Sequence, residues 1–249
     1  MNIALIGYGK MGREIEQISI ERGHSIAAKF DIDSPLPSAD LSMYTSTKID
    51  CCIDFSTASV VTTNVGILAQ RKIPIVIGTT GWNDQLSQVK ETIARHNGSL
   101  IYGSNFSVGA HVFFKLAELA AELLNNHSQY DAAVHEIHHT MKKDAPSGTA
   151  LTIAQKILSR MKRKTRVKLP TETSLIQPND LLVSSSRVGT VFGTHSVLFN
   201  SLADDIELTH RAHNRKGFAL GAVLAAEWIQ GKKGVFTVED MIFENKHSL

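Results

Sequence analysis

The chain has 249 residues, of which 43% are apolar, enough for a sizeable hydrophobic core in one large domain or two modest ones. These values exclude the disordered and fibrous classes. Lysine and arginine number 26 against 24 for aspartate and glutamate, so the formal charge is only +2 and no overall field favours nucleic acid or an anionic membrane. Any anion binding must be local.

The two cysteines, Cys51 and Cys52, are adjacent in an apolar run. Neighbouring cysteines seldom meet disulfide geometry, so we interpret them as buried thiols in a reducing compartment. The dense basic run 160–168 has no interleaved aromatic residue for base stacking and is interpreted as a solvated helix end and loop. No signal-peptide pattern or apolar run of membrane-helix length is found. We expect a soluble, cytoplasmic protein with no membrane or nucleic-acid partner.

Short apolar runs alternate with helical spacing through the first hundred residues. Apolar residues such as Met11, Ile15 and Ile18 recur at helical spacing between these runs. A strand-then-helix repeat of about 25 residues predicts a doubly wound parallel sheet of Rossmann type, an α/β fold. The runs expected to be buried strands are residues 2–6, 25–30, 50–55, 73–77 and 99–102.

The pattern changes after Ser107. A long helix is expected over residues 109–125, an alternating strand over 130–139 and a helix over 149–161. From Leu181 onward three strand-like segments follow one another through short turns, which predicts a mixed or antiparallel sheet in a second, α+β domain. The tail GFALGAVLAAEWIQG then returns to helix.

The motif G-x-G-x-x-G, here GYGKMG, stands between the first strand and the first helix. Gly7 permits a tight turn, Gly9 lets the backbone approach a pyrophosphate, and Gly12 allows close helix packing. The helix that begins around Lys10 and Met11 supplies N–H groups for the phosphates. The motif alone is weak, but its place at the first strand of a β/α repeat favours dinucleotide binding over a purely structural turn.

Two acids and two loops extend this predicted cofactor site. Asp31 or Asp33, after the second strand, can accept hydrogen bonds from a ribose 2′-hydroxyl, although either could be an ordinary loop acid. A carboxylate there repels a 2′-phosphate, whereas Lys10 could attract one, so NADH or NADPH is expected, with NADH favoured. Two loops that follow strands could border the nicotinamide, although turn-forming residues would look similar. These loops contain Gly78, Thr79, Thr80, Ser104, Asn105 and Phe106.

The segment His135 to His139 reads HEIHH and so matches H-E-x-x-H, a zinc-hydrolase pattern that requires a helix. The residues around it alternate as in a strand, on which His135 and Glu136 point to opposite faces. We therefore expect no metal site. A zinc hydrolase stays open as an alternative interpretation. Loss of activity in the presence of a chelator would identify it.

Cationic residues, a proline-glycine turn and a helix start follow this strand directly. His138, His139 and Lys142 precede the turn, and Gly148 and Thr149 open the next helix. Helix N-termini bind carboxylates through free N–H groups, and lysine and histidine add positive charge, so the segment is suited to a small polycarboxylate. A helix cap with surface lysines is the alternative.

The stretch EIHHTMKKDAPSGTA, from Glu136 to Ala150, closely resembles the signature of the 4-hydroxy-tetrahydrodipicolinate reductase (dihydrodipicolinate reductase) family. The resemblance covers nearly the whole chain in the same order, through GYGKMG, IDFS, GTTG, SNFSVG, RVGTVFGTH and LTHRAHNRKGFALGA. Two departures are a glycine loop one residue shorter than the common G-x-x-G-x-M-G form, and Ile32 where many members carry a basic residue. The second departure weakens any preference for NADPH.

The resemblance implies a nucleotide domain of residues 1–107 with 216–249, and a substrate-binding and oligomerisation domain of residues 108–215. It implies that hydride transfer from the nicotinamide reduces a cyclic dicarboxylate to tetrahydrodipicolinate, in lysine and diaminopimelate biosynthesis. A homotetramer is expected, with the sheet after Leu181 as its interface.

Residue by residue, His138 and His139 match the family's paired histidines. Lys142 matches its proposed acid, and Gly148 and Thr149 match its carboxylate-binding helix start. Hydride addition pushes electrons toward the ring nitrogen, which then needs a proton that Lys142 can give. For His138 two roles stay open, an acid or a polar neighbour that binds and orients substrate.

The role of one further residue and one rival function stay open. Arg215, near the return to the first domain, could reach a substrate carboxylate or could be a surface hinge residue. The main rival from another class is a nonenzymatic NAD(P)-sensing protein of Rossmann type. Such a protein would keep the glycine loop but would have no reason to carry HHTMKKDAPSGTA.

Overall fold

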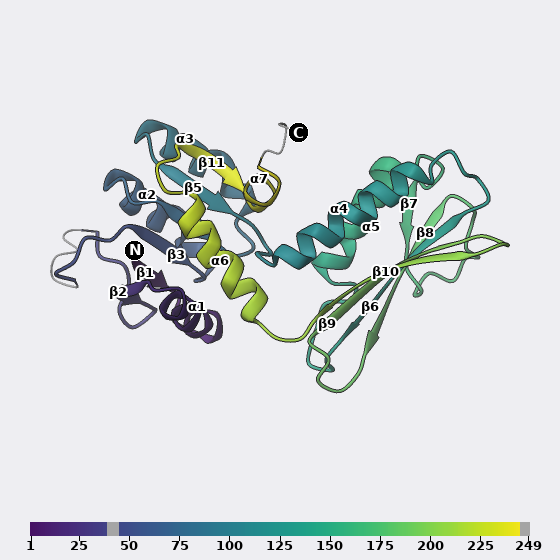
Figure 1. The fold of residues 1–249 in the computed structure, drawn as a ribbon, viewed down its shortest axis with the longest axis horizontal. Coiled ribbons are helices and arrows are strands. Elements are labelled where there is room, and N and C mark those ends of the chain that lie inside the picture. The colour runs from purple at the N-terminus through teal and green to yellow at the C-terminus, as the bar shows by residue number, and fades with distance from the viewer. Residues whose placement is uncertain (39–44, 245–249) are drawn as a thin grey trace. The chain divides into compact units, whose positions relative to one another are not determined.

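The structure is a computed structural model that describes residues 1–38 and 45–244 (Figure 1). Contacts divide the chain into two compact units. The first unit is Met1–Val108 with Arg215–Leu249, and the second is Gly109–Asn214. Within the described ranges, no helix is long and apolar enough to cross a membrane.

The first unit is a parallel six-stranded sheet with helices on both faces. Alternate residues of its short strands face two separate cores, so Cys51 and Cys52 are both buried but belong to opposite sides of the sheet. The strand order is β11-β5-β4-β3-β1-β2. The strands are β1 (Asn2–Ile6), β2 (Ser25–Phe30), β3 (Cys51–Asp54), β4 (Ile75–Ile77), β5 (Ser99–Tyr102) and β11 (Gly234–Thr237).

The helices of the first unit follow the strands in the manner of a doubly wound fold. Helices α2 and α3 contribute to one core, and α1 and α6 contribute to the other. The fold class predicted from the apolar runs is therefore confirmed. The helices are α1 (Lys10–Glu21), α2 (Val61–Gln70), α3 (Leu86–Arg95), α6 (Lys216–Trp228) and α7 (Val238–Phe243), with 3₁₀ turns at Ala58–Val60 and Asn83–Gln85.

The second unit has a five-stranded mixed sheet in the order β10-β9-β6-β8-β7. Strand β6 pairs in parallel with β8 and antiparallel with β9, as the sequence predicted for a mixed sheet. One face of the sheet packs against α4 and α5. The elements are α4 (Val108–Leu123), β6 (Asp131–His138), α5 (Gly148–Arg160), β7 (Arg166–Lys168), β8 (Asp180–Arg187), β9 (Gly193–Asn200) and β10 (Asp205–Ala212).

The conformation of β6 determines how the segment HEIHH is interpreted. Its buried positions alternate, with Glu136 and His138 on the inner face and His135 half-buried on the other. The segment is a strand, as the alternation predicted, and the helical zinc-hydrolase arrangement is absent from it. Three short elements, β7, β11 and α7, were not predicted from the sequence.

Candidate active site

The glycine-rich turn of the first unit borders a cavity of about 400 Å³ at the carboxyl ends of β1, β2 and β3. Open parallel sheets bind ligands at this edge. The residues that line the cavity are Ile6, Gly7, Gly9, Asp31, Ile32, Pro35, Leu36, Phe55, Ser56, Thr57, Val60 and Asn64.

The three glycines of the turn have different surroundings. Gly7 has a φ of +83°, and a Cβ atom there would lie 2.4 Å from the Phe55 carbonyl oxygen. A Cβ atom on Gly12 would lie 2.5 Å from the Gly7 oxygen. At Gly9, by contrast, a Cβ atom would meet no heavy atom of the described residues within 4 Å. Gly7 and Gly12 are thus required by the fold, and Gly9 faces open space just before Lys10 and Met11 begin α1.

The acid after β2 that lines the cavity is Asp31. Its backbone exchanges hydrogen bonds with Ser34, and its Oδ1 accepts one from the N–H of Ile32 at 2.9 Å. Asp33 is exposed within the same tight turn, but it is not one of the residues that line the cavity. The structure therefore gives the two acids, which the sequence left equivalent, different surroundings.

A buried carboxylate fixes the next two loops. Asp54, at the end of β3, is 1% exposed and accepts hydrogen bonds from the Ser56 N–H at 2.9 Å and its Oγ at 2.5 Å. It also accepts from Asn64 Nδ2 at 2.8 Å and Thr79 Oγ1 at 3.1 Å. The IDFS and GTTG segments are therefore held together, a role for Asp54 that the sequence reasoning missed.

The residues predicted to border the nicotinamide differ in accessibility. Gly78 packs against the Phe55 ring, since a Cβ atom there would lie 2.1 Å from it. Phe106 is 1% exposed in the core, with its ring centroid 6.0 Å from that of Phe55. Asn105 Oδ1 accepts a hydrogen bond from the Ser107 N–H at 2.8 Å. Thr80 and Ser104 are exposed, and Thr79 is buried.

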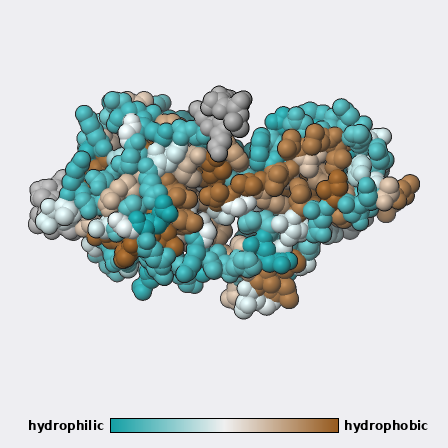
Figure 2. Space-filling model, viewed as in Figure 1, coloured by the Kyte–Doolittle hydropathy of each residue, from teal (hydrophilic) through white to brown (hydrophobic). Residues whose placement is uncertain are grey.

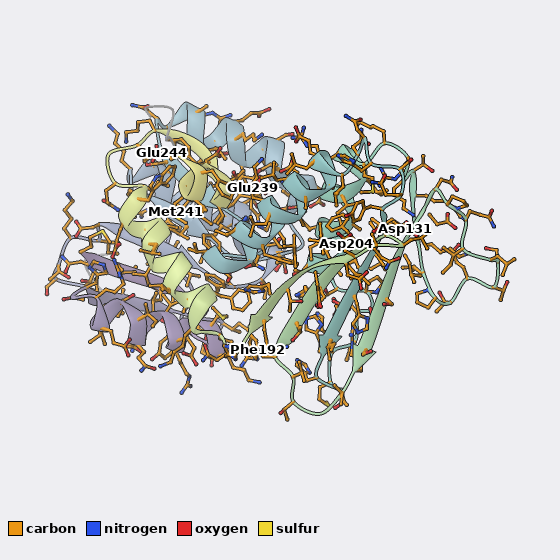
Figure 3. All side chains as sticks on the ribbon, turned by 45° about the vertical axis from the view of Figure 1, so that its right-hand side comes forward. Asp131, Phe192, Asp204, Glu239, Met241 and Glu244 are labelled. Atoms are coloured by element: carbon orange, nitrogen blue, oxygen red, sulfur yellow. The ribbon has the colours of Figure 1, made fainter. Side chains whose placement is uncertain are left out.

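The second unit holds a buried cluster around Glu136. Figure 3 marks the two ends of its sheet, with Asp131 and Asp204 at one end and Phe192 at the other. Strand β6 runs from Asp131 to His138 and β9 begins after Phe192, so Glu136, His138 and His195 lie toward the Phe192 end.

Glu136 is fully buried and its carboxylate is hydrogen-bonded through both oxygens. Oε1 accepts from the Ser147 N–H at 3.0 Å, Ser185 Oγ at 2.9 Å and an Arg187 guanidinium nitrogen at 3.0 Å. Oε2 accepts from the Ser147 hydroxyl. Burial alone would raise the pKa of Glu136, but contacts with His195, Ser147 and Arg187 outweigh it and hold the pKa well below its usual range. Glu136 is therefore a fixed anion.

Two imidazoles flank the same carboxylate. Oε2 of Glu136 lies 3.3 Å from His138 Nδ1, without hydrogen-bond geometry, and 3.5 Å from His195 Nε2. The two rings meet edge to face with centroids 5.1 Å apart. Burial lowers the pKa of His138 to about 4, although the charge of Glu136 acts to raise it. The ring of His138 is therefore neutral near pH 7.

The turn after β6 carries the lysine predicted to be the acid. Lys142 Nζ contacts both carboxylate oxygens of Asp144, at 2.8 and 2.9 Å. Its N–H donates to the carbonyl oxygen of half-buried His139 at 3.1 Å, and Lys143 is exposed as expected. Arg187 donates to the Asp144 carbonyl oxygen at 2.5 Å, which ties this turn to the Glu136 cluster.

Helix α5 begins where this turn ends. Ser147 is its N-cap, and the Ser147 hydroxyl oxygen accepts a hydrogen bond from the Ala150 N–H at 3.2 Å. The N–H groups of Gly148 and Thr149 have no acceptor inside the helix. A Cβ atom on exposed Gly148 would meet no described atom within 4 Å, so this end of the helix opens to space. Arg215 is half-buried at the start of α6, in the first unit.

The side chains of Glu136, His138 and His195 lie close enough together to hold a metal ion. However, Glu136 is already neutralised by the Arg187 guanidinium and hydrogen-bonded through both oxygens. A cation would have to displace these donors, so the chemistry of this donor set does not fit a metal centre.

Comparison with known proteins extends over both units. Residues 1–106 match the family model "Dihydrodipicolinate reductase, N-terminus", and residues 109–242 match "Dihydrodipicolinate reductase, C-terminus". The 4-hydroxy-tetrahydrodipicolinate reductase of Christiangramia forsetii is 40% identical over 242 residues, 97% of this chain and 98% of the relative. The chain belongs to the dihydrodipicolinate reductase family. The resemblance found in the sequence is thereby confirmed.

Other members of the dihydrodipicolinate reductase family agree. The 4-hydroxy-tetrahydrodipicolinate reductase of Archaeoglobus fulgidus is 33% identical over 97% of this chain and 100% of its own. The structure of a dipicolinate-bound dihydrodipicolinate reductase from Paenisporosarcina sp. TG-14 superposes with a TM-score of 0.77 at 25% identity, over 95% of this chain and 97% of the other. The chain is thus an oxidoreductase that reduces 4-hydroxy-tetrahydrodipicolinate in lysine biosynthesis and uses a nucleotide cofactor. The nonenzymatic alternative is wrong.

Sequence reasoning missed most of the Glu136 cluster in this family member. In the sequence, Glu136 stands out only as part of the H-E-x-x-H pattern and of the family signature, and the segment RVGTVFGTH indicates no role for Arg187 or His195. The sequence did contain a signal. On these strands, a few polar residues stand at inward-facing positions that are otherwise apolar, which indicates a buried polar cluster. The register joins them, because Glu136 pairs with both Ser185 and His195, and His138 pairs with Arg187.

The glycine turn yields a paired prediction. We expect Gly9→Ala to leave the free energy of unfolding within about 0.5 kcal/mol of wild type, because its methyl group meets open space. The same methyl group would obstruct a pyrophosphate, so NADH affinity should fall at least about tenfold, or about 1.4 kcal/mol. Fluorescence titration and urea unfolding measure the two quantities.

Gly12→Ala is the matched control. Its methyl group would lie 2.5 Å from the Gly7 oxygen, so it should destabilise the protein by about 1–3 kcal/mol. Wild-type NADH affinity in Gly9→Ala would contradict the assignment of the cofactor to this turn.

Proposed function

We propose that the start of α5 and Lys142 hold a cyclic dicarboxylate substrate, and that the cavity of the first unit holds NADH in preference to NADPH. The observation that carries the substrate assignment is that the Lys142 ammonium and the N–H groups of Gly148 and Thr149, which have no acceptor inside the helix, stand on either side of the same short turn. Dipicolinate, which the Paenisporosarcina relative binds, is a cyclic dicarboxylate.

The cofactor preference rests on the charge of the cavity wall. Asp31 and the 85% exposed side chain of Ile32 line it, and neither offers a positive charge to a 2′-phosphate. The open space at Gly9 fits the approach of a pyrophosphate to the backbone. When bound, the nicotinamide supplies the hydride.

The substitution Asp31→Asn tests this preference. Two unit charges 4 Å apart repel by about 1–4 kcal/mol at a water-like or surface dielectric, so removing one should raise relative use of NADPH by about tenfold. The ratio of kcat/KM with NADPH to that with NADH measures the effect. Asp33→Asn, in the same turn but outside the cavity lining, should leave that ratio near wild type. An unchanged ratio in both variants would refute the assignment of the cofactor preference to Asp31 and its turn.

In the second unit, we assign different roles to His138 and Lys142 in the transfer of a proton to the substrate. The buried ring of His138 is neutral near pH 7, and the single N–H of a neutral imidazole is too weak an acid to protonate the substrate, so we assign His138 to binding and orientation. The Lys142 ammonium carries one, and its partner Asp144 is 57% exposed, which makes that ion pair weak and exchangeable for a substrate carboxylate. In this scheme Lys142 first anchors the substrate and then protonates the ring nitrogen. His139 and Arg215 are proposed to bind substrate.

Replacement of Lys142 by alanine tests the acid role. General acid catalysis contributes about 10²–10⁴-fold, so kcat should fall by about that factor. NADH affinity should stay near wild type, because the cavity proposed for the cofactor belongs to the first unit. Steady-state kinetics with enzymatically generated substrate measure both.

Lys143→Ala is the control, since that side chain is exposed in the same turn. If Lys142→Ala kept kcat within about threefold and only raised KM, Lys142 would be a uniform binding residue instead.

We further propose a homotetramer assembled through the second unit. Val197 and Phe199 face the helices, while Leu198 on the opposite face of the sheet is 40% exposed. A small open sheet has a second face to cover. Figure 2 shows further hydrophobic surface over α4, whose exposed apolar residues share one stripe. These are Val108, Val112, Leu116, Leu119 and Leu123.

Sedimentation velocity at assay concentration should give the mass of four chains. A monomer under those conditions would refute this assembly.

A further inference from the structure

We propose that Glu136 is a positioning residue whose carboxylate holds both ends of the Asp144–Ser147 turn, and so places Lys142 beside the start of α5. The inference rests on the proposed function of Lys142 and α5. It assigns a role in the reaction to a side chain that does not itself reach the substrate.

The first end of the turn is held through Arg187. One guanidinium nitrogen donates both to Glu136 Oε1, at 3.0 Å, and to the Asp144 carbonyl oxygen, at 2.5 Å. The backbone of Asp144 is therefore fixed relative to the sheet. Lys142, two residues earlier, contacts the side chain of the same aspartate.

The second end is held directly. Glu136 Oε1 accepts from the Ser147 N–H at 3.0 Å, and Oε2 accepts from the Ser147 hydroxyl. Because the same hydroxyl caps α5 by accepting from Ala150 N–H at 3.2 Å, Glu136 also sets where the helix begins. The N–H groups of Gly148 and Thr149, which have no acceptor inside the helix, follow immediately.

The same carboxylate contributes to the placement of His138. The His138 ring lies between Glu136 Oε2, 3.3 Å from Nδ1, and the backbone of Gly193, where a Cβ atom would lie 3.0 Å from Nε2. A side chain at position 193 would press against the ring, so glycine here leaves the ring its space. The Glu136 carboxylate thus contacts groups that position three features of the proposed substrate site: the turn that carries Lys142, the start of α5 and the His138 imidazole.

A carboxylate suits this position because it accepts hydrogen bonds only, through both oxygens. Its donors are an N–H group, two hydroxyls and a guanidinium, and the group is fully buried, so water cannot replace it. Loss of the negative charge would leave the Arg187 guanidinium, whose side chain is 19% exposed, without its buried partner.

The variant Glu136→Gln tests the role, because it keeps the shape and removes the charge. Small displacements of catalytic groups by remote changes can cost about 10²-fold, so kcat should fall by about that factor. The dissociation constant of dipicolinate, measured by calorimetry on the NADH-bound enzyme, should rise at least about tenfold. NADH affinity should be unchanged. General destabilisation would lower the active fraction but would not weaken dipicolinate binding per folded molecule.

Asp180→Asn is the matched control. Asp180 is also a buried, arginine-paired acid of the second unit, bound to Arg166 at 2.6 Å, but it lies at the other end of β8. The control should lose stability while keeping kcat and dipicolinate affinity within about twofold, as expected for a site not coupled to the chemistry.

Dipicolinate affinity and kcat within twofold of wild type in folded Glu136→Gln would overturn the proposal. Should that variant not fold, Arg187→Lys takes its place, because it keeps the positive charge but loses the bridge between Glu136 and the Asp144 carbonyl oxygen. Arg187→Lys should also raise the dissociation constant of dipicolinate. Wild-type values in Arg187→Lys would overturn the proposal equally. Normal turnover in Lys142→Ala would instead refute the proposed function. A damaged Lys142→Ala with a normal Glu136→Gln would refute only the role of Glu136.

Discussion

The arrangement of the second unit depends on an ionised carboxylate buried inside a β-sheet. An unpaired charge in such a place would be strongly unfavourable, so Glu136 can persist only because Ser147, Ser185 and Arg187 donate to it. Those donors come from β8 and from the turn before α5, which means that the folding of β6 against its neighbours and the shape of the turn are mutually dependent. The same requirement that keeps Glu136 hydrogen-bonded keeps the turn in place.

The first unit uses the same physical device. Asp54 is buried at the end of β3, and it gathers Ser56, Asn64 and Thr79 from three segments of the chain. In each unit, a buried acid joins loops near a proposed ligand site, and the proposed ligand-facing groups include a glycine with open space beside it. Gly9 and Gly148 are alike in this respect, since a side chain at either would extend into open space.

Most of the fold could be predicted from local pattern. The apolar runs at β1 to β5, the glycine turn at Gly7 and the alternation of β6 are short-range signals, and each appears in the structure. Strand β11 gave no such signal, because its four residues are all half-buried and only pairing with β5 makes them a strand. The Glu136 cluster could not be read in the same way. Ser185 and Arg187 follow Glu136 by 49 and 51 residues, and only the register of β6 with β8 brings them together.

The most direct test of the account is a crystal structure of the enzyme with NADH and dipicolinate. We expect one ligand carboxylate to accept hydrogen bonds from the N–H groups of Gly148 and Thr149. Lys142 Nζ should move from Asp144 to the ligand, and the hydrogen bonds of Glu136 should be unchanged. Dipicolinate bound away from the start of α5, with Lys142 still on Asp144, would contradict the account.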